Sequence, residues 1–332
     1  MKFARFEDGR SALVIQADGL QLLDVTASTA WLRAFDPRAA ETIAGVLPAA
    51  GGHSWVEMIS RWDEVRGAFG SLIELVLSRR GDSPALQPFE TARLGPPLAS
   101  PTSHIFSLSS NTVIHIQRAF QVMFGTELSA DDVLKAKTEG LPPGGFTIWP
   151  DSVVGPNGTI TPPKGTRLFD YEAECAVYVK RGGRNCEHVE LWGHAAWNDL
   201  GVRDANLHLK KDSRWGPFSL NLMKNFDSAN ACGPWVAVDE GHDITKLQCS
   251  LKVNGEPRQD WNLADMIYSF DETLRFISTY ATLRPGDVLT SGTGAGTAIE
   301  KGIDGADWLK PDDVVEITLD GAGTLRNMVG HW

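Results

Sequence analysis

Two glutamates, Glu172 and Glu174, stand two residues apart in an apolar stretch with the alternation of a β-strand, residues 169–179. A period of two places both carboxylates on one face, roughly 6.5–7 Å apart along the strand. The apolar side chains of the other face are Ala173, Cys175, Val177 and Val179. Two like charges this close repel unless a cation lies between them, so the pair predicts a divalent-metal site. The alternative is an exposed edge strand with two solvated glutamates.

A third carboxylate, Asp199, follows 25 residues after Glu174 in the segment 195–204. Together the three side chains offer hard oxygen ligands, which suit Mg²⁺, Mn²⁺ or Ca²⁺. No cysteine–histidine cluster accompanies them, which argues against zinc. Three protein ligands of about six would leave room for water and a chelating substrate. Alone, Asp199 would read equally well as a turn residue beside an asparagine.

Three further positions carry groups that are typical of active sites. His115 falls on the first turn of a predicted helix, where a capping or surface histidine is the alternative. Lys224 is a lone lysine in a mostly uncharged stretch, and it would point either into a pocket or along the surface. The run 292–296 is GxGxG and lacks the spacing of a dinucleotide loop. It predicts a loop whose N–H groups approach an anionic ligand, with the Thr293 hydroxyl as a further donor.

The elements that must position these residues fall into two regions. Residues 1–98 predict a small α+β domain, with strands at 3–6, 12–15 and 20–25 and helices at 29–34, 38–46 and 54–78. A stretch rich in proline and small residues, 94–101, reads as a linker. Residues 99–332 predict a mainly β domain with some helices. This pattern is α+β and does not fit a doubly wound α/β domain.

Composition narrows the class of protein. The net charge of −11 argues against nucleic acid or an anionic membrane as a main partner. No apolar run approaches ~18–20 residues, so no membrane span is predicted. The start of the chain has no apolar signal-peptide core. The four cysteines are scattered and form no CxxC pair, which indicates reduced thiols in a cytoplasmic protein.

The chain resembles the fumarylacetoacetate hydrolase family over about residues 103–330. The resemblance rests on ordered motifs at 170–174, 198–204, 224–227, 233–235, 253–260, 285–288 and 323–327. It implies a distorted β-barrel or β-roll catalytic domain, a small N-terminal domain and a homodimer. It also implies that Glu172, Glu174 and Asp199 hold the divalent metal.

The resemblance extends to the remaining site residues. His115 matches the family's general base, Lys224 its active-site lysine, and Thr293 the threonine of its substrate-carboxylate loop. The further candidates for substrate binding are Asn111, Arg203 and Gly292.

The sequence also departs from the family pattern. Many members carry glutamate three residues after the histidine, where this chain has Arg118. Glu316 matches a position from which some members supply a carboxylate to the histidine, so it is the predicted replacement.

These residues predict a metal-dependent hydrolase that cleaves a carbon–carbon bond in a 1,3-diketo acid or acylpyruvate. The substrate is thus expected to be a small oxo acid. The nearest alternative is a decarboxylase, an isomerase or a dehydratase of 2-keto-3-deoxy sugar acids that uses the same metal enolate. Loss of the histidine–glutamate pair would favour that alternative. A third possibility is a non-catalytic protein that binds an oxo acid.

Overall fold

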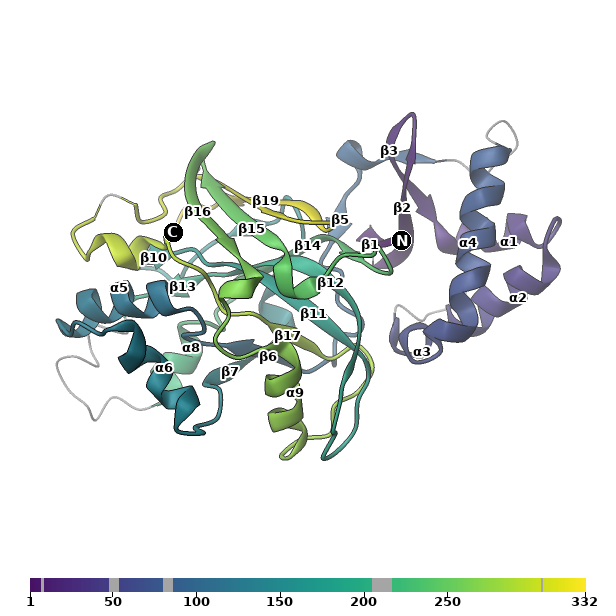
Figure 1. Cartoon of the computed structure of the whole chain (residues 1–332). Helices are drawn as coiled ribbons and strands as arrows, with labels where there is room; N and C mark the ends of the chain where they lie inside the picture. Colours follow the sequence, from purple (N-terminus) through teal and green to yellow (C-terminus); the bar gives the residue numbers. More distant parts are fainter. Residues whose placement is uncertain (7–8, 48–53, 80–85, 205–216, 306) are drawn as a thin grey trace.

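The computed structural model describes residues 1–6, 9–47, 54–79, 86–204, 217–305 and 307–332. Within them the strands form one 12-stranded sheet, one five-stranded sheet and one two-stranded sheet. Figure 1 shows the N-terminal helices grouped on one side, with the first strands beside them and most of the remaining strands on the other side. The predicted α+β class is confirmed. Among the described residues the sheets do not close into a barrel, so the structure is open where a distorted barrel was expected.

The 12-stranded sheet carries the candidate site. Its main path runs β4-β3-β2-β1-β14-β12-β11-β17-β6-β7, with β5 paired to β1 and β8 to β14. In chain order these strands are β1 (Lys2–Phe6), β2 (Arg10–Ala17), β3 (Gly19–Asp24), β4 (Gln87–Pro88), β5 (Leu94–Gly95), β6 (Ile105–Leu108), β7 (Gly145–Ile148), β8 (Val153–Val154), β11 (Ala173–Arg181), β12 (Glu190–Asp199), β14 (Asn230–Ala237) and β17 (Val288–Thr290).

Strand β11 lies inside this sheet, between β12 and β17, and both of its faces are buried. One face contributes Cys175 and Val177 to the main hydrophobic core. The opposite face contributes Ala176 and Tyr178 to a second core with the N-terminal helices. The predicted alternation is therefore confirmed. The alternative of an exposed edge strand is wrong, because β11 has a hydrogen-bonded neighbour on each side.

The N-terminal region joins the sheet directly. Strand β1 pairs with β14, opposite Val236 and Ala237. The N-terminal helices are α1 (Val25–Leu32), α2 (Pro37–Val46), α3 (Val56–Ser60) and α4 (Trp62–Ser78). Their apolar sides bury Trp55, Trp62 and Phe69 against strand residues beyond the linker, such as Trp192. The domain boundary at residue 98 stays a prediction, but both sheet and core run across it.

The five-stranded sheet packs against the main sheet and completes the larger core. Its order is β16-β15-β18-β19-β9, and its strands are β9 (Thr159–Ile160), β15 (Gln248–Val253), β16 (Glu256–Asn262), β18 (Val314–Leu319) and β19 (Gly323–Val329). The predicted hairpin turn is confirmed at Asn254 and Gly255, which both have positive φ, as a type I′ turn requires. The two-stranded sheet pairs β10 (Phe169–Asp170) with β13 (Gly201–Val202).

Four further helices follow the N-terminal region. They are α5 (Val113–Phe124), α6 (Ala130–Thr138), α8 (Pro217–Leu222) and α9 (Phe270–Ser278). Two of them, α5 and α8, contribute residues to the candidate site. The 3₁₀ turns are η1 (Phe89–Thr91), η2 (Pro150–Ser152), η3 (Ile244–Lys246), η4 (Leu263–Asp265) and η5 (Ala298–Lys301). The predicted capping box at Ser269 and Glu272 is confirmed at the start of α9. Among the described residues, no helix has the length and apolar character needed to cross a bilayer.

Candidate active site

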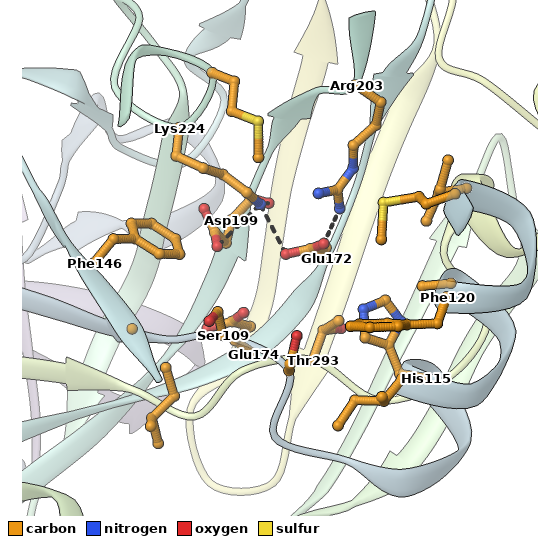
Figure 2. Close-up of a pocket in the computed structure, with 18 of the residues that line it drawn as sticks. Ser109, His115, Phe120, Phe146, Glu172, Glu174, Asp199, Arg203, Lys224 and Thr293 are labelled. Carbon is orange, nitrogen blue, oxygen red and sulfur yellow. Dashed lines mark hydrogen bonds and ion pairs between the residues drawn. The ribbon is translucent and has the colours of Figure 1, made fainter. Parts of the chain in front are cut away.

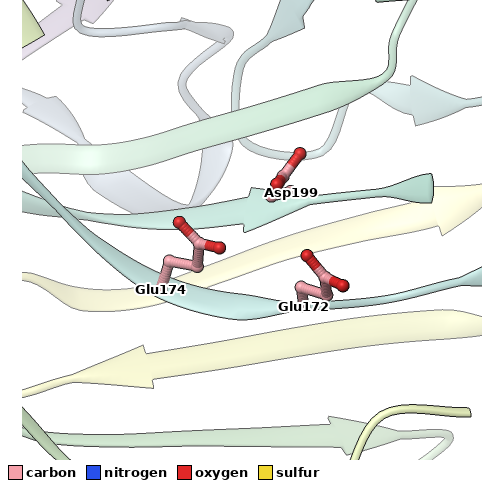
Figure 3. A group of neighbouring side chains, drawn as sticks. All are labelled: Glu172, Glu174 and Asp199. Atoms are coloured by element: carbon pink, nitrogen blue, oxygen red, sulfur yellow. The ribbon is translucent and has the colours of Figure 1, made fainter. Parts of the chain in front are cut away.

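The three predicted carboxylates converge. Glu172 lies just before β11, Glu174 is the second residue of β11, and Asp199 ends the neighbouring strand β12. The Asp199 N–H donates to the Glu172 carbonyl at 3.0 Å, which fixes the relative position of the two strand ends. One carboxylate oxygen from each residue lies within 4.8 Å of the other two, and all three side chains are buried (Figure 3).

The charge of this cluster fits a divalent cation. If all four buried carboxyl groups, those of the cluster and Asp170, were ionised, the two buried cations Arg203 and Lys224 would leave two negative charges uncompensated. The Glu174 Oε1 and Asp199 Oδ1 atoms are buried without a hydrogen-bond partner. Buried acceptors without partners are costly, and an oxygen-preferring cation would satisfy both atoms. Glu172, Glu174 and Asp199 would therefore hold the metal.

The two cations hold Glu172 between them (Figure 2). Lys224 Nζ lies 2.8 Å from Glu172 Oε2, 2.8 Å from the Asp199 carbonyl oxygen and 3.1 Å from Asp199 Oδ2. Arg203 bonds to Glu172 and, through Nε at 2.9 Å, to Asp170 Oδ2. All three ammonium N–H bonds of Lys224 thus have acceptors nearby. Arg203 lines the cavity, as expected for a substrate-binding residue, but its guanidinium already serves two carboxylates.

Burial and neighbouring charges give the three carboxyl groups different pKa values. Burial raises the pKa of Glu174 well above its usual value, and the Asp199 and Glu172 charges raise it further. Burial also raises the pKa of Asp199, to about 7, although Lys224 acts in the opposite direction. Burial would raise the pKa of Glu172 too, but Arg203 and Lys224 outweigh it and lower that pKa to about 2. The shifts favour the ionised form of Glu172 and the protonated form of Glu174, and they favour the protonated form of Asp199 below about pH 7. A cation would displace these protons.

Metal affinity should therefore depend on pH. A cation binds the carboxylate form, so the proton on Asp199 must leave, and its pKa of about 7 sets the range. Asp199 alone should raise the apparent Mn²⁺ affinity about tenfold between about pH 6 and pH 8, and loss of the Glu174 proton would add to this rise. Titration of metal-free protein with Mn²⁺, followed by electron paramagnetic resonance at constant ionic strength, would measure this. An affinity that does not change over this range would contradict the assignment of Asp199 as a ligand.

His115 has a carboxylate partner, but it is not the predicted one. His115 Nδ1 lies 2.7 Å from Glu300 Oε1, and the two side chains are 10% and 1% exposed. The prediction that Glu316 supplies this carboxylate is wrong. Glu316 lies on β18 opposite Arg326, whose Nε is 3.8 Å from its Oε1. With Nδ1–H donated to Glu300, the imidazole keeps Nε2 as a proton acceptor.

Glu300 is held in place by its own turn. Its Oε2 accepts from the Gly296 N–H at 2.9 Å, and its Oε1 lies 3.2 Å from the Thr297 hydroxyl. Arg118 lies 3.5 Å from the same Oε2. Arg118, which replaces the glutamate of the family pattern, thus contacts Glu300, the carboxylate partner of His115. A sequence signal for Glu300 existed, because Thr297 followed three residues later by glutamate is a helix-start pattern.

Two predicted substrate-binding groups instead support the loop behind the site. The Asn111 amide donates to the Ser291 carbonyl at 2.8 Å and the Tyr268 carbonyl at 3.1 Å, and it accepts from the Tyr268 N–H. Neither Asn111 nor Gly292 lines the cavity. The Gly292 N–H donates to Glu174 Oε2 at 3.2 Å, so it orients a candidate ligand residue. A direct contact of either residue with substrate stays a prediction.

Thr293 does line the cavity, but its hydroxyl is engaged. It donates to the Ala173 carbonyl at 3.1 Å and accepts from Gln259 Nε2 at 2.8 Å. Gln259 also donates to the Gly294 carbonyl at 2.9 Å and accepts from the Ala173 N–H. Gln259 thus positions the loop, a role that its place in the motif at 253–260 does not reveal. A contact between Thr293 and substrate stays a prediction.

The glycines of this loop are required by packing. A Cβ on Gly294 would lie 2.1 Å from Trp261 Cγ, and one on Gly296 would lie 2.1 Å from the Arg258 carbonyl oxygen. We expect Gly294→Ala to lower the free energy of unfolding by about 1–3 kcal/mol, because neither the loop nor the buried indole can move freely. Urea denaturation would measure the change. Gly302→Ala is not a matched control because of its positive φ, whereas Gly67→Ala, on α4 in open space, is suitable. A loss no larger than that of Gly67→Ala would contradict the packing argument.

The three carboxylates, the two cations, Thr293 and His115 meet at one cavity of about 500 Å³. The carboxylates, Arg203, Lys224, Thr293 and His115 occupy part of its wall (Figure 2). Ser109, Ser110, Gly145 and Asn221 also line it, and apolar side chains form the remainder. The apolar lining consists of Leu108, Ile116, Ala119, Phe120, Met123, Phe146, Met223 and Ile299. The cavity therefore combines an acidic cluster, a histidine–carboxylate pair and an apolar surface.

Known proteins are similar to this chain in sequence and in fold. The family model described as fumarylacetoacetate (FAA) hydrolase C-terminal matches residues 105–330. The chain therefore belongs to the fumarylacetoacetate hydrolase family.

Individual relatives cover different shares of the chain. A maleylpyruvate hydrolase of Aquipseudomonas alcaligenes is 27% identical over 326 residues, which span 98% of each chain. An uncharacterised protein of Archaeoglobus fulgidus is 32% identical over 180 residues, or 53% of this chain. The matched region covers 64% of that relative's own length and 65% of a Burkholderia cenocepacia putative hydrolase, just under two thirds in each case.

Solved structures share the fold over nearly the whole chain. A maleylpyruvate hydrolase from Sphingobium sp. SYK-6 is 22% identical, with a TM-score of 0.66 and 99% coverage of both chains. The same enzyme in complex with manganese(II) and pyruvate is 20% identical, with a TM-score of 0.65. A probable 2-hydroxyhepta-2,4-diene-1,7-dioate isomerase from Mycobacterium abscessus is 21% identical, with a TM-score of 0.67. At this identity the likeness establishes the fold.

Proposed function

We propose that this protein is a divalent-metal-dependent hydrolase that cleaves the carbon–carbon bond of an acylpyruvate. The observation that carries the proposal is one cavity containing two unpartnered buried carboxylate oxygens and, beside them, the His115–Glu300 pair. The names of the relatives support it, since one is a maleylpyruvate hydrolase and a solved structure of such an enzyme contains manganese and pyruvate. Mg²⁺ and Mn²⁺ are both suited to the donor set.

A divalent cation bound by the three carboxylates would polarise a chelating 2-oxo acid. His115, oriented by Glu300 through Nδ1, would accept a proton from water at Nε2. The water oxygen bonds to the acyl carbonyl carbon, and the bond between that carbon and the pyruvate methylene breaks. Its electron pair goes to the pyruvate fragment, which regains the proton from His115. The products are a carboxylic acid and pyruvate.

Lys224 is proposed to favour negative charge at the oxo-acid end. Its ammonium lies within 3.1 Å of two of the candidate ligand residues, so it also keeps these carboxylates together. Stabilising an oxyanion would require one of its present hydrogen bonds to be exchanged for the substrate.

The test is the product count. Protein freed of metal and then supplied with Mg²⁺ or Mn²⁺ would be incubated with acetylpyruvate, with pyruvate measured by lactate dehydrogenase and acetate by mass spectrometry. Equal amounts of pyruvate and acetate are expected, and none without metal. Carbon dioxide, or a single product of unchanged carbon count, would instead support the decarboxylase, isomerase or dehydratase alternative. The Glu300 partner of His115 favours hydrolysis, because the alternative was suggested by the absence of such a carboxylate.

A further inference from the structure

The Glu300 carboxylate is shared by two side chains of helix α5. Its Oε1 lies 2.7 Å from His115 Nδ1, and its Oε2 lies 3.5 Å from Arg118 Nη1. The Glu300 side chain is 1% exposed, whereas the Arg118 side chain is 56% exposed. His115 and Arg118 are three positions apart on the helix, which makes them neighbours on its surface. A proton on His115 would therefore place two positive charges beside one buried carboxylate.

The two partners of Glu300 line different cavities. His115 lines the active-site cavity with the carboxylate cluster (Figure 2). Arg118 instead lines a second cavity, of about 350 Å³, which Glu300 also borders. Arg118 therefore reaches the site through Glu300. Glu300 does not depend on Arg118 for its position, because the Gly296 N–H and the Thr297 hydroxyl also hold its carboxylate.

The charge of Arg118 opposes protonation of His115. An exposed ion pair has little effect on a titration, because water screens both charges. Here the shared carboxylate is buried, so charges around it interact more strongly than in water. Like charges three or four positions apart on a helix repel, and a nearby cation disfavours the imidazolium. We infer that Arg118 is a positioning residue of the proposed reaction, which acts through Glu300 and keeps His115 unprotonated in mildly acidic solution.

The inference rests on the proposed function, because the unprotonated imidazole is the base that takes the proton from water. The same repulsion helps the later step, in which the imidazolium returns its proton to the pyruvate fragment. Arg118 thus extends the range of pH over which His115 can complete the cycle.

Charged and titratable groups on the neighbouring elements stay the same when Arg118 is replaced. Before β11, the charge of Glu172 interacts with His115, and Tyr171 interacts with Glu300. The lysines of α6 and η5 are exposed or bind a glutamate of α9. The set comprises the lysines Lys135, Lys137 and Lys301, the exposed acids Asp131 and Asp132 of α6, and the cavity cations Arg203 and Lys224. Variants of Arg118 therefore isolate the charge of this one side chain.

A pH series on three variants tests the inference. Arg118→Gln removes the charge and Arg118→Lys keeps it. Lys135→Gln is the matched control, because it removes an exposed charge from α6 that pairs with Glu139. Acetylpyruvate cleavage would be measured with saturating Mg²⁺ at each pH. In Arg118→Gln the acid limb of kcat/KM should move up by about 0.5–1 pH unit, so that kcat/KM near pH 6 falls about 3–10-fold.

The shape of the profile separates this role from a structural one. Arg118→Lys should recover at least about half of the shift, and Lys135→Gln should keep the wild-type limb. A limb that does not move in Arg118→Gln would overturn the inference. So would a loss of equal size at every pH, or an Arg118→Lys profile that matches that of Arg118→Gln.

A measurement without turnover separates the inference from the proposed function. Nuclear magnetic resonance of ¹³C-labelled histidine in the Mg²⁺-loaded protein follows protonation of His115, whose signal is identified by its loss in His115→Asn. The titration midpoint should rise by about 0.5–1 pH unit in Arg118→Gln. This rise without release of pyruvate by any of the proteins would support the role of Arg118 and refute the hydrolase. Release of pyruvate with an unchanged midpoint would refute the role of Arg118 and leave the hydrolase standing.

Discussion

Replacing Glu174 by glutamine should abolish Mn²⁺ binding and lower kcat by at least about 10³-fold, because a cation would lose a charged ligand on which metal catalysis depends. Glu174 Oε1 is buried without a partner, and the Gly292 N–H orients the other oxygen. The glutamine side chain has nearly the same shape, so the change removes charge without opening a cavity. Mn²⁺ titration and the pyruvate assay on the same preparation would measure both losses.

The same variant should not lose stability in the absence of metal. Burial and the neighbouring Asp199 and Glu172 carboxylates make a charge on Glu174 unfavourable, which is why its pKa is raised. Removing that charge should leave the metal-free protein as stable as the wild type, or more stable, at about pH 8. Thermal unfolding of the variant and the wild type, measured in the presence of a chelator, would test this prediction. A Glu174→Gln protein with full turnover would end the ligand assignment, and loss of activity with unfolding would leave it unsupported.

Replacing His115 by asparagine should lower kcat about 10²–10⁴-fold while Mn²⁺ still binds, because the change removes the proposed base and leaves the carboxylates intact. Glu300→Gln should lower kcat about 10–100-fold, since a neutral amide at position 300 no longer fixes the imidazole of His115 with its Nδ1–H toward that side chain. The pyruvate assay over a range of pH, with Mn²⁺ affinity measured in parallel, separates these effects from metal loss.

Glu316→Gln is the discriminating control for that pair. Glu316 was the carboxylate that the family comparison suggested, whereas the structure places it on β18 beside Arg326. We expect Glu316→Gln to retain wild-type kcat. A loss equal to that of Glu300→Gln would show that the observed His115–Glu300 contact is not the functional one.

The central strand was predictable because its information is local. Alternation over residues 169–179 identified the two faces of β11, and two glutamates on one face indicated the cluster before any partner was known. Asp199 was harder, since only strand pairing brings it to Glu172. The helix-start and hairpin signals at Ser269 and Asn254 also depend on a few adjacent residues, and both were confirmed.

Contacts between residues distant in the chain could not be predicted from the sequence. His115 and Glu300 are 185 positions apart, and nothing in either segment specifies their pairing. Asn111 and Gly292 have the residue types of ligand-binding groups, but the folded loop uses them internally, for Ser291 and Glu174 respectively. Residue type and spacing therefore predicted the chemistry of the site, whereas tertiary packing decided which polar atoms remain available to a substrate.

The pairing of β1 with β14 has a consequence for any attempt to produce the second region alone. Removing residues 1–98 would strip Val236 and Ala237 of their partners in β1, on one edge of β14, and uncover Trp192 and Tyr178. A newly bare strand edge beside exposed aromatic rings is a template for self-association. The shortened protein should therefore form aggregates during expression, even though every proposed catalytic side chain would still be encoded in it.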